Sequence, residues 1–146
     1  MTDEAVTKHA RDRASEGQPL PGSVLVVDDD DAYRRIAALR LSAGGVACRV
    51  AGTHEEALCL LRKHGDIDVV VVDYHMRGDD PAKLVHCIRA ERPDVAIVGH
   101  SSMERRGHFA ALGVDRFLLK PWTPEQLMAL LRHDPAQSDK RGSRAS

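Results

Sequence analysis

The sequence has few aromatic residues, little net charge and no long apolar segment. Phe, Trp and Tyr together make up 3% of the 146 residues, too few for the stacking platforms that hold single-stranded nucleic acids. A formal net charge of −1 gives no electrostatic reason to expect contact with nucleic acid or an anionic membrane. No apolar run approaches the roughly 20 residues of a membrane span. Composition therefore favours a soluble globular domain.

Cysteine is also scarce, with three residues in the chain: Cys48, Cys59 and Cys87. They are odd in number, far apart and set among apolar residues, which predicts buried, reduced thiols in a cytoplasmic protein. Residues 1–22 lack the apolar core of a secretory signal and are predicted to form a flexible extension. Residues 134–146 are polar and are predicted to be a disordered tail or linker. One domain is expected over residues 23–133.

Within that domain, short apolar runs alternate with amphipathic segments. Strands are predicted at residues 24–27, 46–51, 67–72, 95–98 and 116–119. Helices are predicted at residues 31–42, where Ile36 and Leu39 are apolar, 53–65, 80–93 and 104–112, and from residue 123 onward. Thr53 with Glu56, and Thr123 with Gln126, fit capping boxes. This alternation predicts a doubly wound α/β fold, a five-stranded parallel sheet with helices on both faces.

Three of the predicted strands end in charged residues. The run Val69–Val72 ends at Asp73, the first strand is followed by four consecutive aspartates, and the last is followed by Lys120 and Pro121. Ligand sites in open α/β sheets lie beyond the carboxyl ends of the strands, so these groups are predicted to share one site. A cis Lys120–Pro121 bond would turn the lysine toward the acids.

Clustered carboxylates suit a hard divalent cation. Like charges raise one another's pKa unless a cation is near, and Mg²⁺ is bound through a few carboxylates while it keeps several waters. Mg²⁺ in turn suggests phosphate chemistry, in which a carboxylate can act as the nucleophile. Phosphoryl transfer needs in-line placement and charge neutralisation, and Lys120 supplies an ammonium group.

The motifs together resemble one family. They are VLVVDDDD at 24–31, VVVVDYHMRG at 69–78, PDVAIVGHSS at 93–102 and GVDRFLLKPW at 113–122. In kind, order and spacing they resemble the receiver domain of bacterial two-component response regulators. The resemblance covers residues 23–133 and implies a flavodoxin-like sheet with strand order 2-1-3-4-5.

The resemblance also implies roles for individual residues. Asp73 matches the aspartate that accepts a phosphoryl group, Lys120 the lysine that pairs with the phosphoryl oxygens, and Phe117 the aromatic residue that changes rotamer on activation. The metal ligands that it implies for Mg²⁺ are Asp28, Asp29, Asp73 and the backbone carbonyl of His75.

The switch hydroxyl is less directly matched. Aligning residues 93–102 from their Pro-Asp start places Ser101 at the family's Thr/Ser position, with Ser102 second; counting back from the Lys-Pro pair places Val98 there, without a hydroxyl. We favour Ser101, which implies a shortened fourth helix. Arg77 stands where the family usually has proline, and the Gly-His pair at 99–100 is an unusual end for an apolar strand. Histidines 75 and 100 could lie near the site and give it pH sensitivity.

Three functions follow as hypotheses. The first is a cytoplasmic signalling switch with at most Mg²⁺-dependent autophosphorylation and autodephosphorylation, whose partners are a sensor histidine kinase or phosphotransfer protein and an unknown downstream protein. It would contact no nucleic acid or membrane directly, and a homodimer stays open. The second is a pseudo-receiver that takes no phosphate and acts as a scaffold or dimerisation module. The third is an aspartate-nucleophile phosphatase, disfavoured because His75 stands where that chemistry wants a second acid.

Overall fold

The computed structural model describes residues 21–132. Its strands are β1 (Ser23–Val27), β2 (Cys48–Ala51), β3 (Ile67–Asp73), β4 (Ala96–Ser101) and β5 (Arg116–Leu119). All pairings are parallel, and the strands lie in the order β2-β1-β3-β4-β5. The predicted fold and strand order are confirmed. The expectations for a flexible amino-terminal extension and a disordered carboxyl-terminal tail fall almost wholly outside the described residues.

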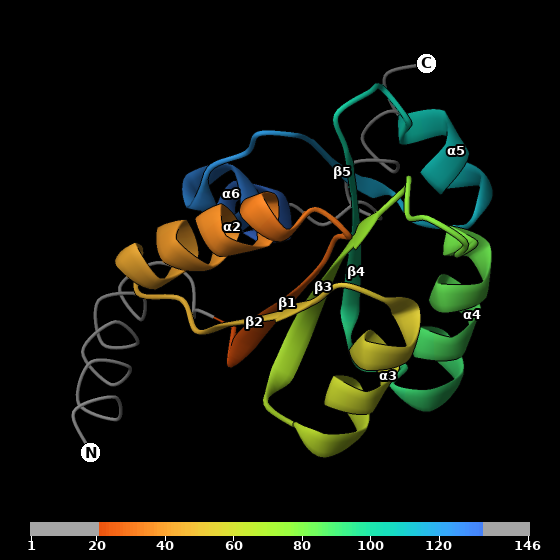
Figure 1. Ribbon diagram of the computed structural model, residues 1–146, viewed down its shortest axis with the longest axis horizontal. Helices are drawn as coiled ribbons and strands as arrows, with labels where there is room; N and C mark the ends of the chain where they lie inside the picture. The colour runs from red at the N-terminus through yellow and green to blue at the C-terminus, as the bar shows by residue number, and fades with distance from the viewer. Residues whose placement is uncertain (1–20, 133–146) are drawn as a thin grey trace, which may run out of the picture.

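Helices cover both faces of this sheet (Figure 1). The helices are α2 (Asp31–Ala43), α3 (His54–Lys63), α4 (Pro81–Glu91), α5 (Arg106–Ala111) and α6 (Pro124–Arg132). Helices α2 and α6 pack on one face, where Leu41 and Leu127 are fully buried, and α3, α4 and α5 pack on the other. Strand β3 lies at the centre between two layers of helices, which explains why five of its seven residues are apolar.

The helix starts follow from local sequence. The Thr123 hydroxyl accepts the Gln126 N–H at 3.1 Å while the Gln126 side chain accepts the Thr123 N–H at 2.8 Å, a complete capping box. Thr53 likewise accepts the Glu56 N–H at 3.1 Å, but the Glu56 carboxylate accepts from the N–H of Gly52 instead of Thr53. The first of the two predicted boxes along the chain is therefore only half formed.

Strand β4 is longer than predicted, and α5 is shorter. The sequence pattern ended this strand at residue 98, but it continues through Gly99 and His100 to Ser101. Glycine is required because a Cβ at residue 99 would lie 2.4 Å from the Phe109 ring. His100 is fully buried, so it is part of the strand and not of a loop after it.

The expectation that the cysteines are buried is wrong, and two apolar residues of α2 are exposed. Ile36 and Leu39 are 45% and 72% exposed, because the helix buries the stripe that contains Ala37 and Leu41. All three cysteines are free, as predicted, but Cys59 is exposed and the other two are half-buried. Within residues 21–132, no helix combines the length and apolarity needed to cross a bilayer.

Candidate functional site

Two buried carboxylates mark the carboxyl edge of the sheet. Asp28 directly follows β1 and is 0% exposed, and Asp73 is the last residue of β3 and is 2% exposed. Because β1 and β3 are paired neighbours, their ends bring the two acids together. This is where the sequence predicted a shared site.

Lys120 comes from the other end of the chain to meet these acids. Its Nζ lies 2.7 Å from Asp28 Oδ2 and 3.5 Å from Asp73 Oδ2. The residue follows β5, the Lys120–Pro121 bond is cis as predicted, and the Tyr33 ring centroid lies 5.0 Å from Nζ. One ammonium group therefore bridges two carboxylates.

The loop after β1 holds Asp28 in a fixed orientation. The Asp30 N–H donates to Asp28 Oδ1 at 2.9 Å, so both carboxylate oxygens of Asp28 have partners. Arg34 donates from α2 to the Asp28 backbone carbonyl at 2.7 Å, and Asp30 caps the same helix by accepting from Ala32 and Tyr33. The second and third acids of the aspartate run thus have different tasks: Asp30 caps the helix, and Asp29 faces outward.

Asp29 lies at the exposed rim of the site. Its Oδ2 accepts the Arg77 N–H at 3.3 Å, across from the loop that follows β3. The Asp29 charge is also one of the influences that raise the pKa of Asp73. Asp29 is therefore close enough to Asp73 to influence its charge and is itself open to solvent.

The site makes Asp73 a weak acid. Burial is the main cause, followed by the negative charge of Asp28; together they raise the pKa of Asp73 to about 7, against opposition from Lys120 and from the backbone N–H of His75. That N–H donates to Asp73 Oδ1 at 3.3 Å. A carboxyl group with this environment gains strongly from a nearby cation.

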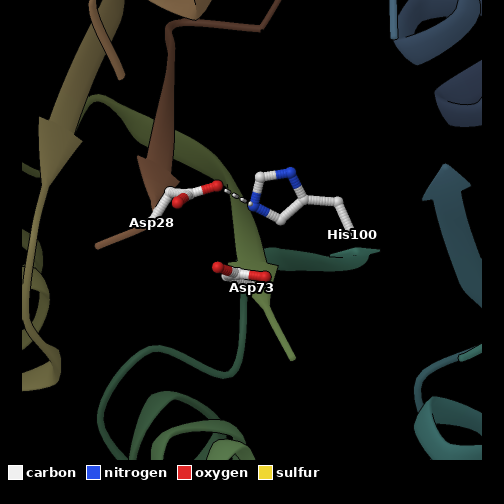
Figure 2. Close-up of side chains that lie close together, drawn as sticks. All are labelled: Asp28, Asp73 and His100. Carbon is white, nitrogen blue, oxygen red and sulfur yellow. Dashed lines mark ion pairs between the residues drawn. The ribbon is translucent and has the colours of Figure 1, made fainter. Parts of the chain in front are cut away.

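His100 is the residue that sequence reasoning placed least precisely. It lies in register with Asp73 on β4, and Figure 2 shows its imidazole directed toward Asp28 beside Asp73. Its Nε2 is 3.5 Å from Asp28 Oδ2, and the Trp122 indole N–H donates to its Nδ1 at 3.1 Å. Burial and the charge of Lys120 lower the pKa of His100 to about 3, so the ring is neutral. The signal in the sequence was a histidine inside an apolar strand.

The remaining predicted residues lie around these groups. Ser101 is fully buried at the end of β4, where its hydroxyl accepts the Met103 N–H at 3.1 Å. Phe117 is 6% exposed, with its ring centroid 5.9 Å from that of Phe109. The His75 side chain accepts from Arg105 Nε at 3.2 Å. Their roles as switch hydroxyl, switch aromatic and metal-binding carbonyl stay predictions.

The donor set fits a hard divalent cation. When Asp28, Asp29 and Asp73 are all ionised, three negative charges face the single positive charge of Lys120, which leaves an excess of two. Carboxylate oxygens are the ligands that Mg²⁺ prefers. Within residues 21–132, Asp28, Asp73 and His100 form a group of potential ligand residues whose atoms lie within 4.8 Å of one another. Asp28, Asp29, Asp73 and the His75 carbonyl would hold the ion, which would supply the missing positive charge.

This arrangement defines a class: a doubly wound α/β domain with buried acids and a bridging lysine at the carboxyl edge of its sheet. A family model described as the response regulator receiver domain matches residues 24–132. The chain belongs to the response regulator receiver domain family. The resemblance inferred from the motifs is confirmed.

Individual relatives agree with that assignment. The chain is 32% identical over 116 residues to the response regulator MprA of a Mycobacterium strain, covering 77% of this chain and 50% of that protein. It is 31% identical over 122 residues to a probable transcriptional regulator of Porphyridium aerugineum, covering 82% of this chain and 50% of the relative. The chain thus spans about half the length of these curated relatives.

Solved structures show the same fold. A response regulator receiver protein from Pseudomonas putida matches with a TM-score of 0.66 and 31% identity, covering 76% of this chain and 95% of that one. A response regulator from Burkholderia pseudomallei, solved with a phosphorylated aspartic acid, calcium ion and citrate, matches with a TM-score of 0.69 and 25% identity, covering 84% of this chain and 72% of that one.

Proposed function

We propose that this domain is a phosphorylation-dependent signalling switch that accepts a phosphoryl group on Asp73 with Mg²⁺ bound. The observation that carries this proposal is the convergence of Asp28, Asp73 and Lys120, with Lys120 Nζ 2.7 Å and 3.5 Å from the two carboxylates. The donor would be a phosphohistidine on a sensor histidine kinase or a phosphotransfer protein. The phosphorylated aspartic acid of the Burkholderia pseudomallei neighbour supports the same chemistry.

The proposed step is a transfer between two nucleophiles. A carboxylate oxygen of Asp73 forms a bond to phosphorus as the phosphorus–nitrogen bond to the donor imidazole breaks, and the leaving imidazole takes up a proton from water. Lys120, whose Nζ already lies between Asp28 and Asp73, would neutralise charge on the phosphoryl oxygens. Mg²⁺ would supply further positive charge at the same oxygens. Hydrolysis of the aspartyl phosphate by water returns the carboxylate, and no other substrate is needed.

Phosphorylation would then act through the neighbouring strands. Ser101 ends β4 next to β5, which carries Phe117, so a shift of the Ser101 loop toward the phosphoryl group would alter the packing under α5. A two-state element biased by a new charge is the usual form of such a switch. A downstream protein in the cytoplasm would bind the altered surface. A second copy of the domain is one such partner, in which case phosphorylation would favour a homodimer.

The direct test uses a small phosphoryl donor. The protein is incubated with acetyl phosphate and Mg²⁺, and its intact mass is measured. We expect one phosphoryl group on the unaltered chain and on Asp115→Asn, a matched control because Asp115 is exposed at the opposite edge of the sheet. We expect none on Asp73→Asn or with EDTA. Phosphorylation that survives Asp73→Asn would reject the assignment.

A second function, a scaffold that takes no phosphate, is favoured by one observation. Both oxygens of Asp28 already accept hydrogen bonds from the protein itself, and Lys120 already neutralises part of the acidic charge. A site whose carboxylates already have hydrogen-bond and ion-pair partners in the protein needs no metal ion to stay folded. Calorimetric titration with Mg²⁺ separates the two functions, because the scaffold requires no Mg²⁺ binding and the switch does.

A further inference from the structure

The Trp122–His100 pair lies directly behind the acidic site. His100 is fully buried on β4, and its Nε2 faces two oxygens: the Val27 carbonyl at 3.4 Å and Asp28 Oδ2 at 3.5 Å. On the other side of the ring, the Trp122 indole N–H lies 3.1 Å from Nδ1. Both ring nitrogens thus have a protein partner.

These partners determine where the imidazole proton resides. An indole nitrogen is a donor only, so Nδ1 must accept and carries no proton. The neutral ring then carries its proton on Nε2, which donates to the Val27 carbonyl and lies 3.5 Å from Asp28 Oδ2. The opposite tautomer would set two donors against each other at Trp122 and two acceptors against each other at Val27, leaving buried groups unsatisfied.

The same tautomer decides which ligands the site offers to a metal. The Nε2 atom is near enough to Asp28 and Asp73 to complete a three-residue ligand group, and an imidazole nitrogen would favour Zn²⁺ or Co²⁺ over Mg²⁺. A protonated Nε2 has no lone pair to give. Trp122 therefore keeps His100 from becoming a ligand and leaves the donor set all oxygen.

We propose that His100 is a positioning residue for the acidic site, held by Trp122 as the Nε2–H tautomer so that it orients Asp28 and does not ligate the metal. This inference rests on the proposed function, because the task it assigns to Asp28 is Mg²⁺ binding. Lys120 and Asp30 donate hydrogen bonds to this carboxylate, and the buried His100 ring lies against it, with Nε2 3.5 Å from Oδ2.

The tautomer is measurable in the unaltered protein. In long-range ¹H–¹⁵N correlation spectra of the metal-free, histidine-labelled full chain, we expect the pattern of a neutral ring protonated at Nε2 for His100. Trp122→Phe keeps a ring but removes the N–H, and we expect it to admit the Nδ1–H tautomer. A ring protonated at Nδ1, or at both nitrogens, in the unaltered protein would overturn the inference.

Metal binding supplies the second readout. We expect His100→Leu to weaken Mg²⁺ binding about 3- to 10-fold in calorimetric titrations, because the variant loses the Nε2–H donor that lies against Val27 and Asp28. His100→Gln, whose amide N–H can take the place of Nε2–H, should stay within about 2-fold. We expect Trp122→Phe to bind Co²⁺ more tightly relative to Mg²⁺. Mg²⁺ affinity unchanged in His100→Leu would overturn the inference. Failure of phosphorylation at Asp73 with the tautomer as described would count against the proposed function alone.

Discussion

Replacing Asp73 with asparagine should stabilise the metal-free protein, and by more at pH 8 than at pH 5. The carboxyl group is nearly fully buried beside Asp28, and asparagine keeps its size without its charge. At alkaline pH the unaltered folded chain holds Asp73 in its ionised form, although burial disfavours ionisation. The asparagine variant carries no charge there and therefore avoids this loss of stability.

The magnitude follows from the pKa of Asp73, which burial and the Asp28 charge raise from 3.8 to about 7 in the folded protein. Between these values the folded protein binds a proton that the unfolded chain has lost, so the free energy of unfolding falls as pH rises through this range. At 1.36 kcal/mol per pKa unit, the full cost is on the order of 4 kcal/mol, and about 2 to 3 kcal/mol of it develops between pH 5 and pH 8.

Urea denaturation in EDTA at pH 5 and pH 8 measures this difference. The advantage of Asp73→Asn over the unaltered chain should grow by about 2 kcal/mol or more from the lower pH to the higher, while Asp115→Asn should follow the unaltered chain. Adding Mg²⁺ at pH 8 should stabilise the unaltered chain and not Asp73→Asn. An Asp73→Asn variant that is equally or less stable at both pH values would refute the reasoning.

Three further predictions concern core packing, the hydrogen bonds of Arg92 and thiol reactivity. Gly99→Ala should destabilise the fold by about 1 to 3 kcal/mol through overpacking against Phe109, partly relieved by Phe109→Leu in the same chain; unchanged urea stability would contradict the contact, in which a new Cβ lies 2.4 Å from the ring. Arg92→Lys should lower the free energy of unfolding by about 1.5 to 3 kcal/mol, because the Arg92 guanidinium donates at 2.9 Å to the backbone carbonyls of Leu61 in α3 and Ile67 at the start of β3. A lysine variant as stable as the unaltered chain would show that these two hydrogen bonds do not stabilise the fold. Ellman's reagent at pH 8 should modify the exposed Cys59 first and Cys48 slowly, since burial raises the pKa of the Cys48 thiol to about 12; equal rates would contradict that burial.

The sequence predicted the fold well because its signals are local and repeated. The apolar run before Asp73 locates β3, and the capping residues Thr53, Asp80 and Thr123 locate the starts of three helices, each to within a few residues. Parallel strands then bring their carboxyl ends to one edge, so the meeting of acids and lysine followed from the order of the elements.

The sequence did not predict the end of β4 correctly, because the burial of its last residues depends on side chains far along the chain. Gly99 and His100 interrupt the apolar pattern of β4, so the sequence pattern predicts that the strand ends before them. The burial of each depends on a side chain well downstream: the Phe109 ring lies over the glycine, and the Trp122 indole satisfies the histidine. A buried polar group is acceptable only when it is hydrogen-bonded, and no local pattern shows that partner.

The most direct test of the central claim is a crystal structure of the full chain with Mg²⁺ and beryllofluoride, which mimics an aspartyl phosphate. We predict beryllium bonded to an Asp73 carboxylate oxygen, Mg²⁺ held by Asp29, Asp73 and the His75 carbonyl with Asp28 beside it, and Lys120 paired with fluoride. Beryllofluoride bound away from Asp73, or a magnesium ion without contact to Asp29 and Asp73, would contradict the account.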